Sequence, residues 1–206
     1  MEFTLAVAAV VFATIFVVEL PDKTFIATLV LATRFRPLLV WVGVTAAFLV
    51  QTLVAVLVGG VLAQLPRTPV QVVAALMFLV GGVILIKGAG SADEEEKETE
   101  EEFSHKGAAT ATGLKAVGTS FLVLFLAEWG DLSQLFTASM VLRYQEPLSV
   151  FVGAFAALAA VSALGALLGR ALLTRIHLST IRRVGGGVCL LIALLTVLEI
   201  AGVIGG

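Results

Sequence analysis

The sequence predicts an all-α integral membrane protein, built from six transmembrane helices that form two inverted three-helix repeats. Three observations lead to this prediction. Of the 206 residues, 59% are hydrophobic and 14% are charged, whereas soluble domains carry about 45 to 50% apolar and about 25% charged residues. Apolar runs of the roughly 20 residues that a membrane-spanning helix requires recur along the chain. Two of these runs contain acidic motifs that match each other.

Six spans result when the apolar runs are divided at proline, glycine and clusters of charge. They cover residues 3–33, 38–64, 70–87, 114–142, 148–173 and 184–204. The first and fourth spans are too long for one straight crossing, and each contains an acidic interruption. We therefore expect the first helix of each repeat to be broken at its acidic motif, where unwound backbone must line a cavity or be buried in protein. Pro21 favours the first break, because its nitrogen carries no hydrogen for the helix ladder.

A polar loop at residues 90–112 separates the first three-helix repeat, residues 1–89, from the second, residues 113–206. The loop holds eight of the 15 acidic residues and many small ones. Such a segment cannot bury apolar surface, so we expect a solvated linker. Its clustered charge also attracts cations without forming a specific site, which leaves a regulatory role open.

The distribution of basic residues predicts the orientation, because Lys and Arg stay on the cytoplasmic side of a membrane. With six spans, ten of them lie on the side of the acidic loop, and only Arg67 and Arg143 lie on the other; Lys23 lies inside a span. We expect the loop in the cytoplasm and both termini outside. The compact chain suggests a bacterial inner (cell) membrane.

An internal repeat emerges when the second half is aligned on the first with an offset of 109 residues. ELPDKTFIATLVLATRF then meets EWGDLSQLFTASMVLRY. The matched residues are Glu19 and Glu128, Asp22 and Asp131, Thr24 and Ser133, Thr28 and Thr137, Arg34 and Arg143, and, after one inserted residue, Gly43 and Gly153, and Gly59 and Gly169. Three spans per copy is an odd number, so the second copy enters the membrane from the opposite side. Inverted repeats whose broken helices meet near the midplane recur in secondary transporters.

The two acidic motifs predict a cation site between the repeats. In each motif a Glu and an Asp are three residues apart, on nearly the same face of a helix. An Asp at the centre of a spanning helix costs about 2.5 to 3.5 kcal/mol, so four carboxylates facing lipid would cost on the order of 10 kcal/mol. They must bind protons or a cation, or face a wet cavity. Hard oxygen ligands without His or Cys suit Mg2+, Ca2+ or Mn2+, and protons compete with the metal for the same carboxylates.

The candidate metal ligands are Glu19, Asp22, Glu128, Asp131, Thr24, Ser133 and Gln134. Gln51 and Thr52 are weaker candidates, because a lone Gln or Thr inside a membrane more often bonds to a neighbouring helix. Lys23 is a candidate site-tuning residue, since the second motif has Leu132 in its place. The alternative is that the acids serve as helix caps or ion pairs, but Lys23 can satisfy only one of them.

Other features have ordinary structural explanations. Cys189 is the only cysteine, which excludes an internal disulfide, and we expect a buried, inert thiol. Paired glycines such as Gly59 and Gly60 predict close helix packing, because nucleotide-binding glycines follow a strand. Glu199 lies late in the last span, and we expect it among the outer headgroups.

At its two motifs the sequence resembles the six-span cation/proton exchanger family of Golgi transmembrane protein 165, chloroplast relatives and bacterial manganese exporters. That family carries E-x-G-D-(K/R)-(S/T) once in each half, joined by an acidic cytoplasmic loop, and ELPDKT and EWGDLS occupy those places here. The resemblance implies exchange of Mn2+, or else Ca2+, for H+. Pro21 replaces the family glycine and Leu132 replaces the basic residue, so the two half-sites differ in charge.

Two classes of function follow from these patterns. The leading one is a secondary transporter that exports Mn2+ from the cytoplasm against inward protons by alternating access, with no permanently bound cofactor. Its partners are the metal ion, protons and the lipid bilayer, with no nucleic acid and with homo-oligomerisation left open. The alternative is an intramembrane enzyme that uses the same carboxylates. A lipid phosphatase would need more phosphate-binding groups than the motifs offer, and an aspartyl protease would need two principal Asp residues.

Overall fold

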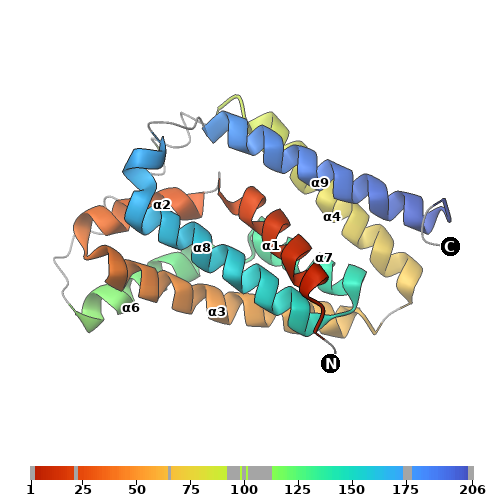
Figure 1. Cartoon of the computed structure of the whole chain (residues 1–206), viewed down its shortest axis with the longest axis horizontal. Coiled ribbons are helices and arrows are strands. Elements are labelled where there is room, and N and C mark those ends of the chain that lie inside the picture. The colour runs from red at the N-terminus through yellow and green to blue at the C-terminus, as the bar shows by residue number, and fades with distance from the viewer. Residues whose placement is uncertain are drawn as a thin grey trace.

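The computed structural model describes residues 3–20, 23–64, 66–91, 98, 101, 113–173 and 178–203. Within these ranges it gives no side chain for Lys23, Arg34, Arg67, Val70, Leu132, residues 168–173, Leu178 and Ile181. Its regular elements are helices (Figure 1): α1 (Leu5–Glu19), α2 (Lys23–Arg34), α3 (Pro37–Leu62), α4 (Arg67–Gly88), α6 (Leu114–Ala127), α7 (Leu132–Tyr144), α8 (Pro147–Leu173) and α9 (Leu178–Ile200). The described residues contain no strand, which confirms the all-α prediction.

Four helices are long and apolar enough to cross a membrane. These stretches are Pro37–Leu62, Gln71–Gly88, Pro147–Leu167 and Arg182–Ile200. Leu5–Glu19 and Thr24–Thr33 also qualify as one broken span, bent by 68°. α6 has only 14 residues, which is too short to cross alone. The described part of the chain therefore offers four spans, or five with the bent pair, and the sixth span stays a prediction.

Both overlong spans are interrupted at the acidic motifs. α1 ends at Glu19 before α2 begins at Lys23, and α6 ends at Ala127 before α7 begins at Leu132. In the second break, Gly130 has a φ of +80°, a left-handed conformation that glycine adopts without a steric cost. Pro21, the expected cause of the first break, lies outside the described residues, as does most of the acidic loop at 90–112.

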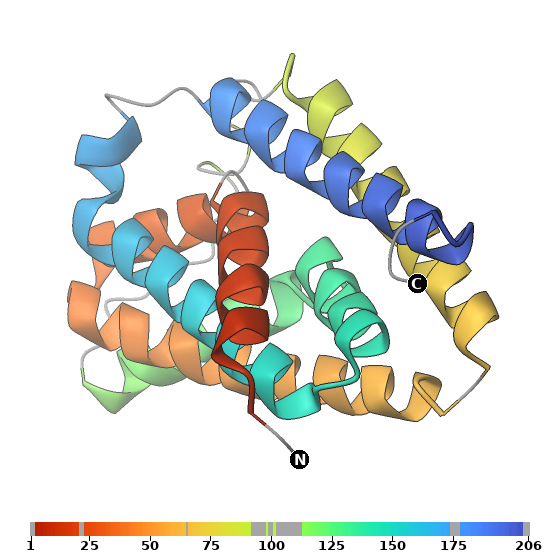
Figure 2. The same cartoon turned by 45° about the vertical axis from the view of Figure 1, so that its right-hand side comes forward.

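Helices from opposite halves of the chain form the core. α1 and α2 pack against α8, and α6 and α7 pack against α3 (Figure 2). The backbones meet where glycine leaves room: a Cβ atom at Gly43 would collide with the Val117 carbonyl of α6, and one at Gly153 with the Ala8 carbonyl of α1. Close packing is thus confirmed at these glycines, whereas Gly60 has no described atom near its Cβ position.

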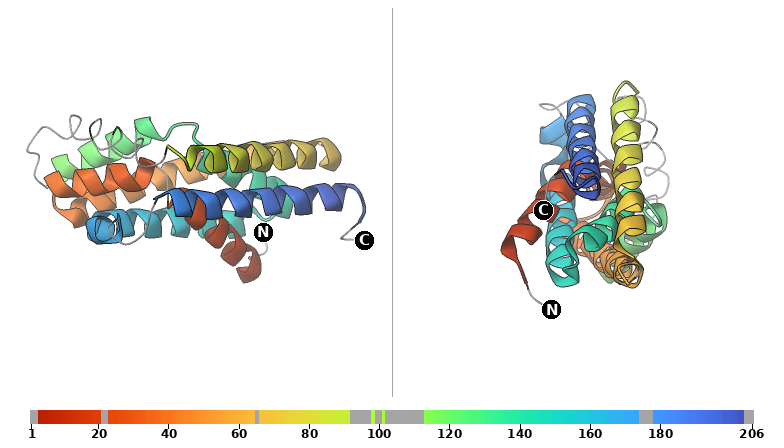
Figure 3. Two further views of the ribbon diagram at one scale, coloured as in Figure 1. Left: turned by 90° about the horizontal axis from the view of Figure 1, so that it is seen from above. Right: turned by 90° about the vertical axis from the view of Figure 1, so that its right-hand side faces the viewer.

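α4 and α9 run side by side in all views (Figure 3). A Cβ atom at Gly186 would lie 2.9 Å from the Gly82 carbonyl oxygen, so these two helices also touch through glycine. At one end of the pair, Arg182 Nη1 donates to the Gly88 carbonyl at 2.7 Å. The pair rests on the remaining helices through α4 against α7 and α9 against α1.

The surface and the core both match a membrane protein. Large apolar side chains are exposed along the outer helices, including Leu57 of α3 and Val80 of α4, as expected where lipid rather than water is the neighbour. Cys189 is fully buried, as predicted. Glu199, expected among the headgroups, forms an ion pair with Arg143 of α7, with 2.7 Å between Nη2 and Oε1.

Candidate metal site

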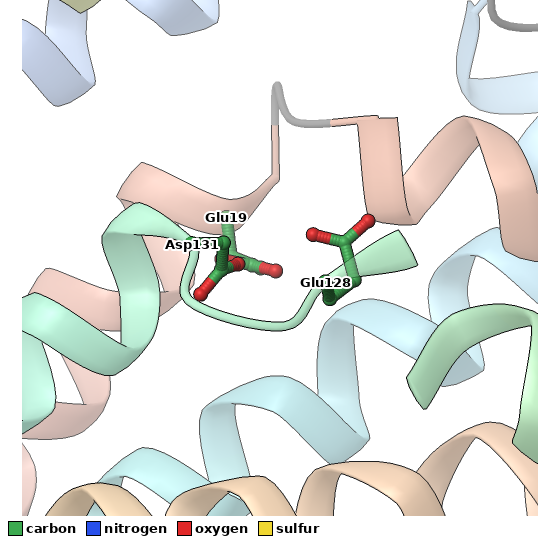
Figure 4. A group of neighbouring side chains, drawn as sticks. All are labelled: Glu19, Glu128 and Asp131. Carbon is green, nitrogen blue, oxygen red and sulfur yellow. The ribbon is translucent and has the colours of Figure 1, made fainter. Parts of the chain in front are cut away.

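Three carboxylates from the two helix breaks converge between the halves of the chain. Glu19 ends α1, Glu128 follows α6, and Asp131 precedes α7 (Figure 4). One carboxylate oxygen from each residue lies within 4.8 Å of one from each of the others. Ligand oxygens on opposite sides of a Ca2+-sized ion are up to about 5 Å apart, because each bond measures about 2.3 to 2.6 Å. The separations are therefore those of oxygens that can share one divalent cation.

Burial makes the negative charge of this cluster costly. The exposed fractions of Glu19 and Glu128 are 0% and 1%, and Asp131 is half-buried. An ionised carboxylate in a low-dielectric interior costs several kcal/mol unless a neighbouring charge compensates it. Three carboxylates this close add mutual repulsion to that cost. Protons or a cation between them would remove both penalties.

Asp131 also caps α7. Its Oδ1 accepts a hydrogen bond from the backbone N–H of Gln134 at 3.1 Å, and the Ser133 hydroxyl lies 3.1 Å from both of its carboxylate oxygens. The helix N-terminus further favours negative charge at this position. An ionised carboxylate has about four lone-pair sites, so capping leaves acceptor capacity for a cation. The helix-cap and metal-site interpretations of Asp131 are therefore compatible.

The two predicted hydroxyl ligands lie in the first turns of the helices that follow the breaks. Thr24 of α2 is fully buried, and its Oγ1 has no hydrogen-bond partner among the described residues. Ser133 of α7 is buried beside Asp131. Each first turn also accepts a hydroxyl from the next turn, through Thr28 to the Thr24 carbonyl at 2.8 Å and Thr137 to the Ser133 carbonyl at 2.7 Å. The matched residues of the two motifs therefore make matched local contacts.

Gln134 places its carboxamide on the backbone of the second break. Its Nε2 donates to the Glu128 carbonyl at 2.6 Å, and its Oε1 accepts from the Gly130 N–H at 3.2 Å. Its predicted role as a ligand is not tested by these contacts, since a carbonyl oxygen has a second lone pair. Gln51 of α3 donates to the Phe125 carbonyl of α6 at 3.1 Å, the bond to a neighbouring helix expected for an intramembrane Gln.

Two predicted site residues stay predictions. Asp22 lies outside the described residues, and Lys23 begins α2 without a described side chain. Sequence reasoning missed the partner of Gln51 and the pairing of Arg143 with Glu199. It had singled out all three residues, but the partners are 74 and 56 positions away along the chain, and nothing in a single sequence links them.

Comparison with known proteins supports a transporter. A family model described as "Divalent cation/proton antiporter GDT1" matches residues 7–93 and 116–202, two stretches that begin 109 residues apart. Protein PAM71, chloroplastic, of Arabidopsis thaliana is 32% identical over 207 residues, which cover 92% of this chain and 56% of PAM71. The GDT1-like protein 1, chloroplastic, of Oryza sativa subsp. indica is 28% identical over 92% of this chain and 61% of its own length.

A cyanobacterial relative, a GDT1-like protein of Synechocystis, is 32% identical over 130 residues, which cover 59% of this chain and 63% of the relative. The chain thus spans 56 to 63% of the length of these relatives. No solved structure matches it. The family match covers most of both halves and includes the acidic motif of each. The chain belongs to the GDT1 family of divalent cation/proton antiporters.

Proposed function

We propose that the chain exchanges a divalent cation for protons across a membrane, with Mn2+ as the preferred cargo and Ca2+ as the second candidate. The observation that carries the proposal is the convergence of Glu19, Glu128 and Asp131 at the two helix breaks. Membership in the antiporter family supports the reaction type. Mn2+ and Ca2+ both accept carboxylate, hydroxyl and carbonyl oxygens. The intramembrane enzyme has no comparable support from the comparisons.

The proposed ligand set extends the three converging carboxylates. Asp22 supplies the fourth acid, and the hydroxyls of Thr24 and Ser133 supply neutral oxygens. The Gln134 carbonyl is a further candidate, and Lys23 tunes the charge of the first half-site. The unpartnered, buried Oγ1 of Thr24 supports its inclusion, because buried polar atoms normally have a hydrogen-bond partner or a ligand.

Exchange follows from competition for the same oxygens. A bound divalent cation neutralises the carboxylates, and protons neutralise them equally well, so arrival of one favours departure of the other. Each carboxylate that changes partner moves one unit of charge between metal and proton. Because two of the glutamates are almost fully buried, the site is costly to leave ionised and empty. This coupling needs no permanently bound cofactor.

Two inverted repeats of three spans would place this site at the repeat interface, with α6 and α7 supplying the sixth span together. The equal offset of the two family-matched stretches supports the repeat. The glycine contacts support it too: Gly43 meets α6 at Val117, and Gly153 meets α1 at Ala8, positions that correspond under the same offset. Alternating access would then arise from movement of one repeat, residues 1–89, against the other.

The remaining proposals concern placement in the membrane. The excess of basic residues on one side supports a cytoplasmic acidic loop at 90–112 and termini outside. Export from the cytoplasm into the space outside a bacterial inner membrane fits this orientation. Two of the relatives described above are named chloroplastic and one is cyanobacterial.

The test is transport by purified protein in liposomes that contain a pH-sensitive dye. Mn2+, Ca2+ and Mg2+ are added outside in turn, and Mn2+ should enter as protons leave, so that the internal pH rises. Protein-free liposomes are the control. If no divalent ion moves or changes the internal pH, the antiporter proposal is wrong. Export is tested in bacteria that express the chain, whose manganese content should fall.

A further inference from the structure

The second helix break contains backbone groups that need partners. The last four carbonyls of a helix and the first four N–H groups of the next have no partner within their own helix. Inside a membrane each unsatisfied group costs several kcal/mol, because no water replaces the missing bond. The break between α6 and α7 must therefore be satisfied by side chains. Two glutamines do this.

Gln134 bridges the break from within α7. Its side-chain nitrogen donates to the carbonyl of Glu128 at 2.6 Å, and its side-chain oxygen accepts from the N–H of Gly130 at 3.2 Å. Its own backbone N–H donates to Asp131 Oδ1 at 3.1 Å. One residue thus holds the backbone of one carboxylate ligand, the backbone next to the other, and the carboxylate of that second ligand.

Gln51 holds the other side of the same break from α3. Its exposed fraction is 2%, and its Nε2 donates to the carbonyl of Phe125 at 3.1 Å. Phe125 lies in the last turn of α6, three residues before Glu128. The bond therefore ties the end of α6 to a helix outside the break.

The first break lacks both glutamines. The repeat offset places Phe25 opposite Gln134 and, after the inserted residue, Val161 opposite Gln51. Both are buried, with exposed fractions of 1% and 0%, and neither side chain can form a hydrogen bond. The residue opposite Gly130 is proline, which has no N–H for a glutamine to accept from and cannot adopt a φ of +80°. The two half-sites therefore differ in their support as well as in charge.

We propose that Gln134 and Gln51 are positioning residues that hold the second break as the preformed half of the cation site, with the first half lacking such support. The proposal rests on the function proposed above, because it assigns these residues to its metal site. Groups that orient metal ligands from behind typically contribute about 10- to 100-fold to metal affinity. Their loss should weaken binding of the cation, while the ligands that exchange protons remain in place.

The first test replaces Gln134 with Met, which has a similar shape but cannot bridge the break. In liposomes, Q134M should raise the KM for Mn2+ by about 10- to 100-fold, with kcat within about threefold of the wild type. Q51M should act in the same direction. Gln64 is exposed just beyond the end of α3, so Q64M is the matched control and should leave KM unchanged. An unchanged KM in Q134M would overturn the proposal.

A second variant separates positioning from direct ligation. Q134E keeps an oxygen that can bind a metal and gains a charge, but its carboxylate cannot donate to the Glu128 carbonyl. If Gln134 positions the break, Q134E should raise KM as Q134M does. Binding as tight as in the wild type, or tighter, would identify Gln134 as a ligand and overturn the positioning role.

Melting of the purified protein in detergent provides a readout that does not depend on transport. The rise in Tm caused by Mn2+ should require higher Mn2+ concentrations in Q134M and Q51M than in the wild type and Q64M. If the wild type moves no divalent ion, the antiporter proposal fails, yet this shift still tests the positioning role. Equal Mn2+ requirements in all four proteins would exclude positioning.

Discussion

At the residue scale, Asp131 caps a helix and faces the candidate metal site, and substitution can separate these two roles. Asn is as good an N-cap as Asp but carries no charge, so Asp131→Asn should insert and melt like the wild type. Its transport of Mn2+ should fall by at least about tenfold, which corresponds to about 1.4 kcal/mol of binding free energy. Asp131→Ala should lose transport and also about 1 kcal/mol of stability through the lost cap.

The measurements for Asp131 are Mn2+ uptake into liposomes and thermal melting in detergent. Glu98 provides the control, because it is an exposed acid of the loop, and Glu98→Gln should change neither readout. Wild-type uptake by Asp131→Asn would show that the residue serves only as a cap.

A pH dependence follows from shared use of the carboxylates of Glu19 and Glu128. Protons and Mn2+ bind the same oxygens, so lowering the pH adds competitor and should raise the KM for Mn2+. Uptake measured between about pH 6 and pH 8, with the same pH on both sides of the membrane, should therefore show the lowest KM at the alkaline end. A KM that does not change with pH would argue against proton coupling at this cluster.

At the element scale, α8 and α1 approach each other through Gly153. A Cβ atom there would collide with the Ala8 carbonyl, and overpacking of this kind typically costs about 1 to 3 kcal/mol. Gly153→Ala should therefore lower the Tm. Gly60 of α3 has no described atom within 4 Å of its Cβ position, so Gly60→Ala should keep or raise the Tm, because Ala favours helix by up to about 1 kcal/mol. Equal effects would show that the Gly153 contact is not tight.

Helix bounds were predictable where a strong local signal marks them. α3 and α8 begin at Pro37 and Pro147, and proline is favoured in the first turn of a helix. α9 was expected from residue 184, yet it begins at Leu178. Arg182 and Arg183 suggested the end of the apolar span, whereas the helix continues through them and Arg182 bonds to the end of α4.

The same limit applies to the site. The repeat alone predicts that Glu19, Glu128 and Asp131 meet, because equivalent acids lie at equivalent breaks. It does not predict what Gln134 and Gln51 bind, since an amide suits a cation and a backbone carbonyl equally. That choice depends on where the chain places the break, which only the structure describes.

At the scale of the whole molecule, the α4–α9 pair is linked to the core through an ion pair. Arg143 of α7 bonds to Glu199 of α9, and it also contacts the hydroxyl of Thr196. The exposed fractions of the two charged side chains are 11% and 32%, so water and headgroups screen the pair in part. We expect a coupling free energy of about 1 kcal/mol, at the upper end for exposed pairs.

A double-mutant cycle tests this coupling. Arg143→Leu and Glu199→Leu should each lower the Tm, and the double variant should lower it by less than the sum, because each single change leaves the other charge without its partner. Strict additivity would show that the pair contributes nothing to holding α9 against α7.

The convergence of carboxylates from both halves has a consequence for energy coupling in the proposed exchange. Glu19 belongs to one half, and Glu128 and Asp131 belong to the other, so a bound cation acts as a crosslink between the two. Without a cation or protons, closing the cage would press like charges to within 4.8 Å of one another. The empty, ionised carrier is thereby prevented from cycling, and neither gradient can be dissipated by a return journey without cargo.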